Sequence, residues 1–346
     1  MSFRALIFIS YLFFVLNAAA DTNTTNRTFV EYIDEKQEII SEKVVDFFDG
    51  IDRGISKWIS SGDDNLYCDE REKKIVDDFF EEQRSIDEFF KDEIYIEESE
   101  ASFIQIRLAT LFQSKEPTSF SPRLRAQIPL IRSQESFQFF VDDINEEQLN
   151  SSTSTSGEKG TDVGVSYSAP PYKNIKSKYS LGVRGLSAYT SARYSKDFKI
   201  KNWLIKPVQQ FKYSTKYDFS EETNIYFDKT LNERSLFRTT LHRKTQAHID
   251  GFDYALAFSY YLALSDRKGF SISQEFWGNS KYVCDAAPEQ YSGISDYSSS
   301  VSWRQDIFRK WIVYEVKPTI SFHRQYDYDP NYKLGFYVDF YFGNLK

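Results

Sequence analysis

The stretch YKLGFYVDFYFGNLK (Tyr332–Lys346) alternates between two kinds of side chain over about its first ten residues. One face is polar or small, and Lys333, Gly335 and Asp339 belong to it. The other face is apolar or aromatic throughout: Tyr332, Leu334, Phe336, Val338, Phe340 and Phe342. A period of two is typical of a β-strand whose two faces meet different surroundings. The mean hydropathy of the chain is -0.52, so this continuous apolar face stands out against a polar background.

The same alternation recurs along residues 101–346, in segments of about eight to fifteen residues. In GFDYALAFSYYLAL (251–264), Leu256 and Phe258 lie on one face, and Ala257 and Ser259 lie on the other. Membrane-spanning strands need about 9–11 residues. The pattern predicts a mainly β chain with about 14 antiparallel strands, and 12 strands is the alternative. A soluble sandwich alternates in the same way, so other features must separate a protein core from a lipid-facing surface.

The first 20 residues have the pattern of a secretory signal. A basic residue, Arg4, precedes an apolar run from Ala5 to Leu16, and small residues follow at Ala18–Ala20. This order predicts a signal peptide over residues 1–20 that is cleaved after Ala20. The apolar run is shorter than the roughly 20 residues that a spanning helix needs, which favours secretion over anchoring.

Residues 21–96 differ from the rest in both charge and period. The net charge is -15 over residues 21–100 and +6 over residues 101–346. Apolar side chains recur every three or four positions, as in amphipathic helices. They include Phe29, Ile33, Ile40, Val44, Phe47, Ile51, Ile55 and Trp58 and, after SSGDDN (60–65), Ile75, Phe79, Ile86, Phe89 and Phe90. The sequence therefore divides into a signal peptide (1–20), an acidic helical region (21–96) and a β-domain (97–346).

Connection lengths and tryptophans favour a membrane barrel over a sandwich. If the first strand runs outward from the periplasm, the two longest connections, 143–160 and 278–293, both fall on the outer side. The tryptophans then lie near strand ends, which is the aromatic-girdle pattern of membrane barrels. In that topology Trp203, Trp303 and Trp311 are at inner ends and Trp277 is at an outer end.

Two prolines do not fit regular strands. Pro207 and Pro318 fall inside predicted strands, and proline cannot donate a hydrogen bond to a neighbouring strand. A closed barrel has no edge where they could lie, so we expect bulges there or strand ends displaced by a few residues.

The closing strand also carries a recognisable signal. Lys333, Gly335, Val338, Phe340 and Phe342 fit the pattern polar-x-Gly-x-x-apolar-x-apolar. This resembles the terminal signal of the outer-membrane β-barrel proteins of Gram-negative bacteria, although residues 343–346 follow where such barrels often end on an aromatic residue. The resemblance covers residues 101–346 and points to no characterised family. It implies a transmembrane β-barrel in the bacterial outer membrane, surrounded by lipid and inserted by the barrel-assembly machinery.

The inward face of the predicted barrel is mainly basic. It carries Arg107, Arg123, Arg125, Lys176, Lys178, Arg184, Lys206, Lys212, Arg238, Arg304 and Lys317 against the acids Asp253, Glu275, Glu315 and Asp339. Charged rings select ions in pores, so this face predicts a porin-like channel that favours anionic solutes. The acidic helices of residues 21–96 could gate or plug it, or bind a periplasmic partner. The alternative is a structural or assembly barrel without an open pore, in which the basic side chains pair with acids.

A hydrolase is the second alternative. The chain has three histidines, His242, His248 and His323, and lacks the His-x-Ser pair of outer-membrane phospholipases. His248 and Asp250, in an outer connection, fit the acidic and histidine pairs of omptin-type proteases only loosely. We predict no catalytic residues, metal site or cofactor, and the sequence leaves the oligomeric state open. The basic residues are dispersed through strands, which argues against nucleic acid as a partner.

Overall fold

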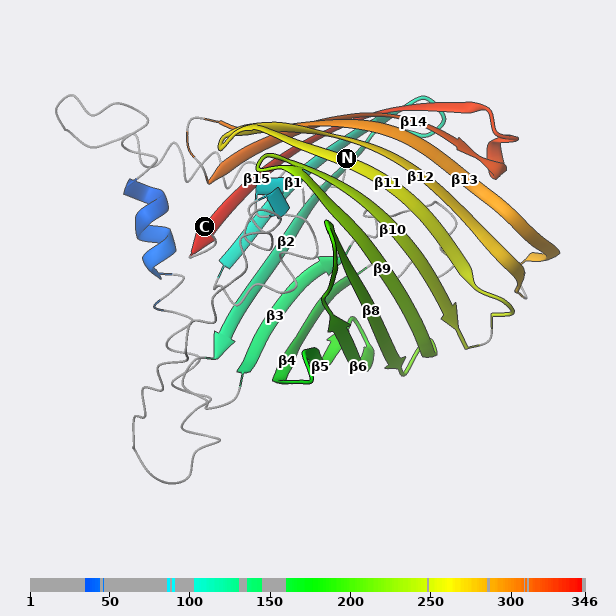
Figure 1. Cartoon of the computed structure of the whole chain (residues 1–346), viewed down its shortest axis with the longest axis horizontal. Coiled ribbons are helices and arrows are strands. Elements are labelled where there is room, and N and C mark those ends of the chain that lie inside the picture. The colour runs from blue at the N-terminus through cyan, green and yellow to red at the C-terminus, as the bar shows by residue number, and fades with distance from the viewer. Residues whose placement is uncertain are drawn as a thin grey trace, which may run out of the picture. The chain divides into compact units, whose positions relative to one another are not determined.

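The computed structural model describes residues 35–43, 46, 86–87, 89–90, 103–130, 136–144, 160–247, 249–284, 287–307, 309 and 311–343 (Figure 1). The predicted signal peptide and most of the predicted helical region lie outside the described residues. Within that region, residues 35–43 are helical, and so are residues 86–87 and 89–90. Among the described helices, none is long and apolar enough to cross a bilayer.

The rest of the described chain is β-structure. Its elements are β1 (Phe103–Gln113), β2 (Ser119–Leu130), β3 (Ser136–Ile144), β4 (Gly160–Tyr172), β5 (Ile175–Arg184), β6 (Ser187–Lys196), β7 (Phe198–Ile200), β8 (Trp203–Ser214), β9 (Asp218–Asn232), β10 (Ser235–Gln246), β11 (Asp253–Ser265), β12 (Lys268–Cys284), β13 (Ala287–Asp306), β14 (Ile312–His323), the 3-10 turn η1 (Arg324–Tyr326) and β15 (Pro330–Gly343).

These strands close into one antiparallel barrel. Apart from β6 and β7, each strand pairs with its neighbour in sequence, and β15 pairs with β1 to close the ring (Figure 1). This last pairing covers all of β1, and Arg107 faces Asp339 in it. The short β7 continues the line of β6, and both pair with β8. The barrel therefore has 14 strands, which confirms the predicted fold class and the larger of the two predicted strand numbers.

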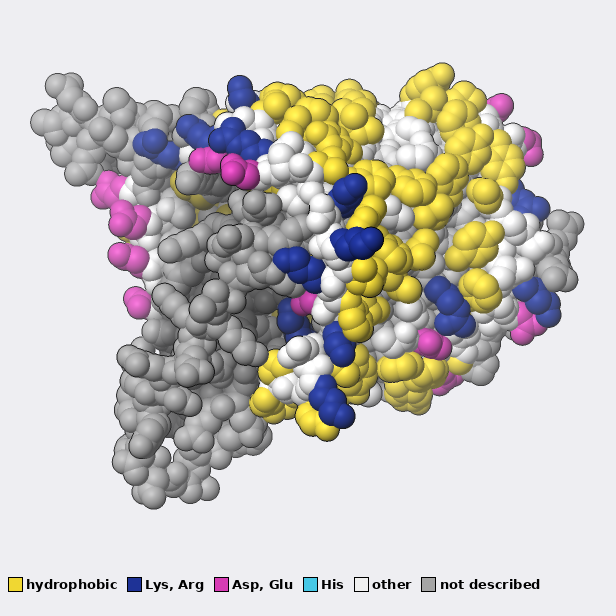
Figure 2. All heavy atoms as spheres, viewed as in Figure 1, with side chains coloured by type: hydrophobic (Ala, Val, Ile, Leu, Met, Phe, Trp, Pro, Cys, Tyr) yellow, Lys and Arg dark blue, Asp and Glu magenta, His cyan; other side chains and the backbone are white. Residues whose placement is uncertain are grey.

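The two faces of the sheet separate by polarity. Apolar side chains on the outer face are well exposed, including Leu181 at 67%, Ile272 at 48% and Phe336 at 42%, whereas Asp339 on the inner face is 1% exposed. Figure 2 shows the resulting broad area of hydrophobic side chains over the strands. A soluble sandwich would bury such a face in its core. The exposed apolar surface and the polar interior are instead the arrangement of a barrel that spans a membrane.

The two ends of the barrel differ. We call the end at which β1 begins and β15 ends the "terminal rim". The opposite end is the "loop rim". The predicted long connection at 278–293 is wrong, because β12 and β13 continue through it as a paired hairpin. Backbone pairing joins Asn279 to Gly293 and Cys284 to Ala287, with shifts of register along the way. The hairpin therefore reaches beyond its neighbours at the loop rim.

Pro207 and Pro318, the two prolines expected to disturb their strands, lie within β8 and β14 but interrupt pairing on one side. Pro207 still faces Ile225 of β9, and Pro318 still faces Leu334 of β15. On their other sides the pairing of β8 passes from β6 to β7 around Pro207, and that of β14 with β13 skips Pro318. Neither ladder shifts its register there, so the expected bulges are absent from these described strands. Because proline has no backbone N–H, each strand simply lacks backbone pairing at the proline on one side.

Candidate functional site in the barrel lumen

The nine basic residues proposed to line the lumen lie on the inner face, and most contact carboxylates. Ion pairs join Arg107 to Asp339, Arg125 to Asp142, Lys176 and Lys206 to Asp197, Arg184 to Asp162, Arg238 to Asp228 and Asp87, and Arg304 to Glu315 and Asp339. Arg123 faces Arg107 across the β1–β2 pair, and Lys178 faces Arg193 across the β5–β6 pair. The lumen is therefore lined by charge pairs rather than by isolated cations.

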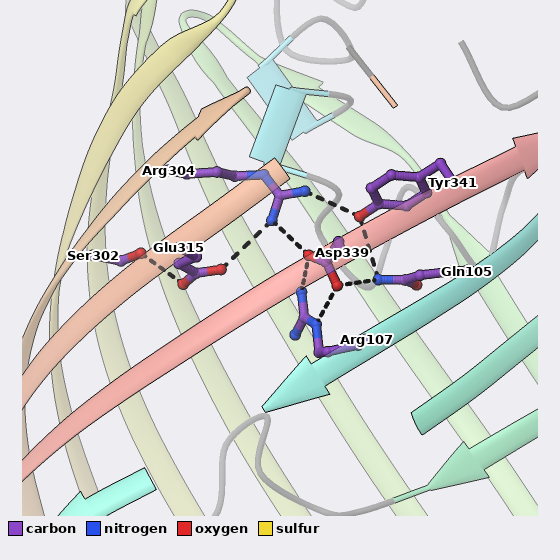
Figure 3. A network of polar contacts seen from close by, with 7 residues as sticks. All are labelled: Gln105, Arg107, Ser302, Arg304, Glu315, Asp339 and Tyr341. Atoms are coloured by element: carbon purple, nitrogen blue, oxygen red, sulfur yellow. Dashed lines mark hydrogen bonds and ion pairs between the residues drawn. The ribbon is translucent and has the colours of Figure 1, made fainter. Parts of the chain in front are cut away.

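One network crosses the seam between the first and last strands of the barrel (Figure 3). Asp339 accepts hydrogen bonds from Nε and Nη2 of Arg107 at 2.6 and 2.8 Å, and from Nε2 of Gln105 at 3.1 Å. Arg304 of β13 donates to the same carboxylate at 3.4 Å and to the Tyr341 hydroxyl at 3.0 Å. Asp339 is 1% exposed and Arg304 is 2% exposed. Two arginines thus share one buried carboxylate.

The network continues along β13 and β14. Arg304 also donates to Glu315 at 3.5 Å, and the Ser302 hydroxyl donates to the other oxygen of that carboxylate at 2.6 Å. The buried charges of Asp339 and Arg304 therefore each have several partners, which a buried ion needs if it is not to destabilise the fold.

A second cluster surrounds Arg238 on β10. Its guanidinium donates to both oxygens of Asp228, at 2.7 and 2.9 Å. Its Nη2 also donates to both oxygens of Asp87, at 3.0 Å each. Arg238 lies 5.7 and 5.9 Å from the ring centroids of Tyr226 and Tyr261. This strand arginine thus binds a carboxylate that comes from the acidic region before the barrel.

The helical residues Ile86, Asp87, Phe89 and Phe90 pack against the same wall, and we call these four residues the docked segment. Ile86 is 2% exposed and Asp87 is 7% exposed. The Phe90 ring meets Tyr261 edge-on at 5.0 Å, and Phe89 meets Phe90 at 4.9 Å. A Cβ atom added at Gly269 of β12 would lie 2.7 Å from the backbone oxygen of Leu262, 2.8 Å from Phe89 and 3.1 Å from Phe90, so glycine makes room for the neighbouring strand and for both rings.

The two clusters adjoin each other near the terminal rim. Gly269, which the docked segment covers, faces Arg304 across the β12–β13 pair. Arg107, Arg238, Arg304 and Asp339 all lie within about five residues of their strand ends at this rim. The seam network and the docked segment therefore narrow the same end of the lumen.

The wall formed by β2 to β8 is different, because bases outnumber acids on it. Its inner face carries Arg123, Arg125, Lys176, Lys178, Arg184, Arg193, Lys206 and Lys212 against Asp142, Asp162 and Asp197. Near the loop rim, Lys212 lies 4.5 Å from the centroid of the Tyr189 ring. This basic wall is the part of the lumen in which positive charge is in excess.

The predicted tryptophan girdle is corrected at one position. Trp203 begins β8 and Trp303 lies near the end of β13, both on outward positions at the terminal rim. Trp311 lies beside the outward rings of Phe340 and Phe342, at 6.5 and 6.1 Å. Trp277 instead faces inward and is 7% exposed, and its ring centroid lies 5.3 Å from that of His242. It shares the inner face of β12 with Glu275, so it cannot reach lipid.

The residues of the terminal signal all lie on β15. Val338, Phe340 and Phe342 point outward, while Lys333 and Gly335 are on the inner face. The strand thus presents its apolar half to the membrane and its polar half to the lumen, as expected from the alternation of the sequence.

The described histidines contact polar neighbours on the inner face and at the loop rim, and His242 lies 3.8 Å from Glu222. His248 lies outside the described residues, and Asp250 pairs with Lys281 at 3.0 Å. His242 contacts Asn224 at 2.7 Å, and His323 accepts from the backbone N–H of Gln325 at 3.1 Å. No cluster that could hold a metal ion occurs among the described residues.

The sequence reasoning missed several acids that complete these pairs. Asp142, Asp162 and Asp228 lie on the inner face, and Asp87 reaches it from the helical region. Strand parity contained a signal for the first three, because each shares the face of its strand that carries small or polar side chains. Nothing in the local pattern around Asp87 indicates that its partner is Arg238, 151 residues away.

Comparison with known proteins gives likeness in fold only. No family model matches the sequence, and a search of curated proteins finds no match. Among solved structures, a loop-deletion mutant of OmpT, an outer membrane protein of Vibrio cholerae, is similar at 8% identity, with a TM-score of 0.47 over 70% of this chain and 98% of that chain. The outer membrane channel DcaP of Acinetobacter baumannii is similar at 7% identity, with a TM-score of 0.42 over 70% and 96%. A KdgM porin is similar at 8% identity, with a TM-score of 0.33 over 68% and 98%. The closed antiparallel barrel itself gives the chain the fold of outer-membrane β-barrel proteins.

Proposed function

We propose that this protein is a porin-like channel of the bacterial outer membrane, closed near its terminal rim by the docked segment and selective for anions when open. The buried ion pair between Asp87 and Arg238 is the observation that carries the proposal. It ties a segment from outside the barrel to the inner wall, where a plug would lie.

The size of the barrel supports a channel. Side chains fill the interior of an eight-stranded barrel, and the lumen widens as strands are added. With 14 strands, a further element is needed to close the lumen. The docked segment supplies apolar and charged contacts for that purpose.

The basic wall supports the preference for anions. The charges of the seam network and of Arg238 with Asp228 largely balance each other, so they contribute little net potential. The excess of bases between β2 and β8 remains when the docked segment leaves. Positive charge inside a low-dielectric wall raises the local concentration of anions.

Lipid and the barrel-assembly machinery are the proposed partners of the outer face and of β15. The exposed apolar face supports the first and the five signal residues support the second. Transport to the outer membrane through a cleaved signal peptide belongs to the same proposal.

Planar-bilayer recording tests the channel and its closure. The wild-type protein is expected to open rarely. Asp87→Asn with Phe90→Ala should open at least tenfold more often, because a lost hydrogen bond between charged groups is worth about 1.5–3 kcal/mol and a tenfold shift in an equilibrium needs about 1.4 kcal/mol. Under a KCl gradient, the reversal potential should show preference for chloride.

The matched control is Asp329→Asn, which removes the same charge from an exposed pair with Lys115. It should leave the opening frequency unchanged. If neither the wild type nor the double variant conducts, the alternative of a structural barrel without a pore replaces the channel. That alternative is favoured by the extent of buried charge pairing at the terminal rim. Cation preference in open channels would refute the anion proposal alone.

A further inference from the structure

We infer that Arg238, Tyr226, Tyr261 and Gly269 form a binding site for an aromatic carboxylate, which Asp87 and Phe90 occupy as an internal ligand. The inference rests on the proposed function to the extent that a solute reaches this wall from the lumen. It adds the site and the chemical class of the solute.

The position of Asp87 shows how the site binds a carboxylate. Both of its oxygens accept from Nη2 of Arg238 at 3.0 Å. Asp228 holds Nε and the same Nη2 from the other side, at 2.7 and 2.9 Å, and so fixes the orientation of the guanidinium. An arginine held in this way is preorganised for a second carboxylate.

Aromatic rings form the sides of the same site. The Arg238 guanidinium lies 5.7 Å from the Tyr226 centroid and 5.9 Å from that of Tyr261. Tyr261 also receives the ring of Phe90 at 5.0 Å. Tyr261 therefore lies beside both the Arg238 guanidinium, which binds the carboxylate, and the position that the Phe90 ring occupies.

Gly269 provides the space for that ring. A side chain there would collide with Phe89 and Phe90, at 2.8 and 3.1 Å from its Cβ atom. When the docked segment leaves, the volume of these rings becomes available beside the carboxylate position. A molecule that joins a carboxylate to an aromatic ring would then make both contacts that Asp87 and Phe90 make.

Competition follows from this shared site. A solute of the right class displaces the docked segment, because both need the same Nη2 donor of Arg238. The internal ligand is held at a high effective concentration by its connection to the barrel. The wild-type protein should therefore bind the solute more weakly than a variant whose docked segment lacks its charge.

Equilibrium dialysis of radiolabelled benzoate against the full-length protein in detergent tests the site without any need for conduction. Asp87→Asn should bind benzoate at least tenfold more tightly than the wild type. Acetate lacks the ring and benzyl alcohol lacks the charge, so each should need at least tenfold higher concentration to displace benzoate. Arg238→Gln with Asp228→Asn and Asp87→Asn removes all three charges of this ion-pair cluster together, and it should weaken benzoate binding by about tenfold to a hundredfold relative to Asp87→Asn alone.

Two further variants keep the test decisive. Lys281→Gln with Asp250→Asn removes an exposed pair and should leave benzoate binding unchanged. If the variant at Arg238 fails to give a folded barrel on an unboiled gel, Tyr261→Leu replaces it and should lower the preference for benzoate over acetate by severalfold. Equal benzoate affinity in the wild type and Asp87→Asn, or acetate displacing benzoate as well as benzoate itself, would overturn the inference.

The results separate this inference from the proposed function. Specific benzoate binding by a barrel that never conducts supports the site and refutes the channel. A conducting, anion-selective barrel without such binding supports the channel and refutes the site.

Discussion

Asp339→Asn is expected to lower the free energy of unfolding of the barrel by about 3–5 kcal/mol, the usual cost of removing one partner from a buried ion pair. The carboxylate is 1% exposed and accepts from Arg107, Arg304 and Gln105. In the asparagine variant Arg304 keeps Glu315 at 3.5 Å, while Arg107 loses its counter-charge and one of its two short hydrogen bonds, because asparagine has only one acceptor oxygen. The loss is measured by denaturant unfolding of the protein refolded in lipid vesicles, followed by tryptophan fluorescence.

Asp329→Asn provides the matched comparison, because Asp329 pairs with Lys115 at 3.2 Å but its side chain is 67% exposed. Exposed pairs contribute about 0–1 kcal/mol. If the two variants lose similar stability, the seam network does not hold the barrel together.

The second large effect is expected from a charge on the outer face. Ile272→Arg should destabilise the barrel in vesicles by about 2–4 kcal/mol, the cost of an arginine facing the middle of a bilayer. Ile272 is 48% exposed and lies between Tyr260 and Val301 on the outer face of neighbouring strands. In a protein surrounded by water, an exposed isoleucine could be replaced by arginine at little cost.

Leu186→Arg is the control, since Leu186 is fully exposed in the tight turn between β5 and β6 at the loop rim. It should change stability by less than about 1 kcal/mol. Unfolding of both variants in vesicles, with migration on unboiled gels as a check of folding, distinguishes a lipid-facing surface from a wet one. Equal, small effects would show that the outer face does not meet lipid.

Strand period allowed most of the barrel to be predicted. An alternating strand commits each residue to one of two faces, so the inner positions of Arg107 and Asp339 could be read directly from the sequence. The same rule does not give the neighbours of a residue on adjacent strands. Pairing between Arg238 and Asp228, or Arg184 and Asp162, depends on register, which is set by turns and bulges.

The failures have local physical causes. Residues 278–293 have polar side chains together with glycine and proline, which is typical of a loop. A hairpin that extends past a membrane meets water on both sides, so it loses the alternation by which spanning strands are recognised. Distance along the strand predicts Trp277 at the membrane edge, whereas its parity on β12 places it with Glu275 on the inner face. The local period predicts that the docked segment is helical, but it does not indicate a contact with a residue 151 positions away.

The pair of Arg107 and Asp339 depends on the register in which β1 and β15 pair. A slip of one residue between β1 and β15 would turn Asp339 toward lipid, and a slip of two would set Arg107 against Tyr337 or Tyr341. Only one alignment brings the carboxylate within reach of both arginines, which come from β1 and β13. A misaligned seam would leave buried charges without partners, so the network favours this one register of closure over its neighbours.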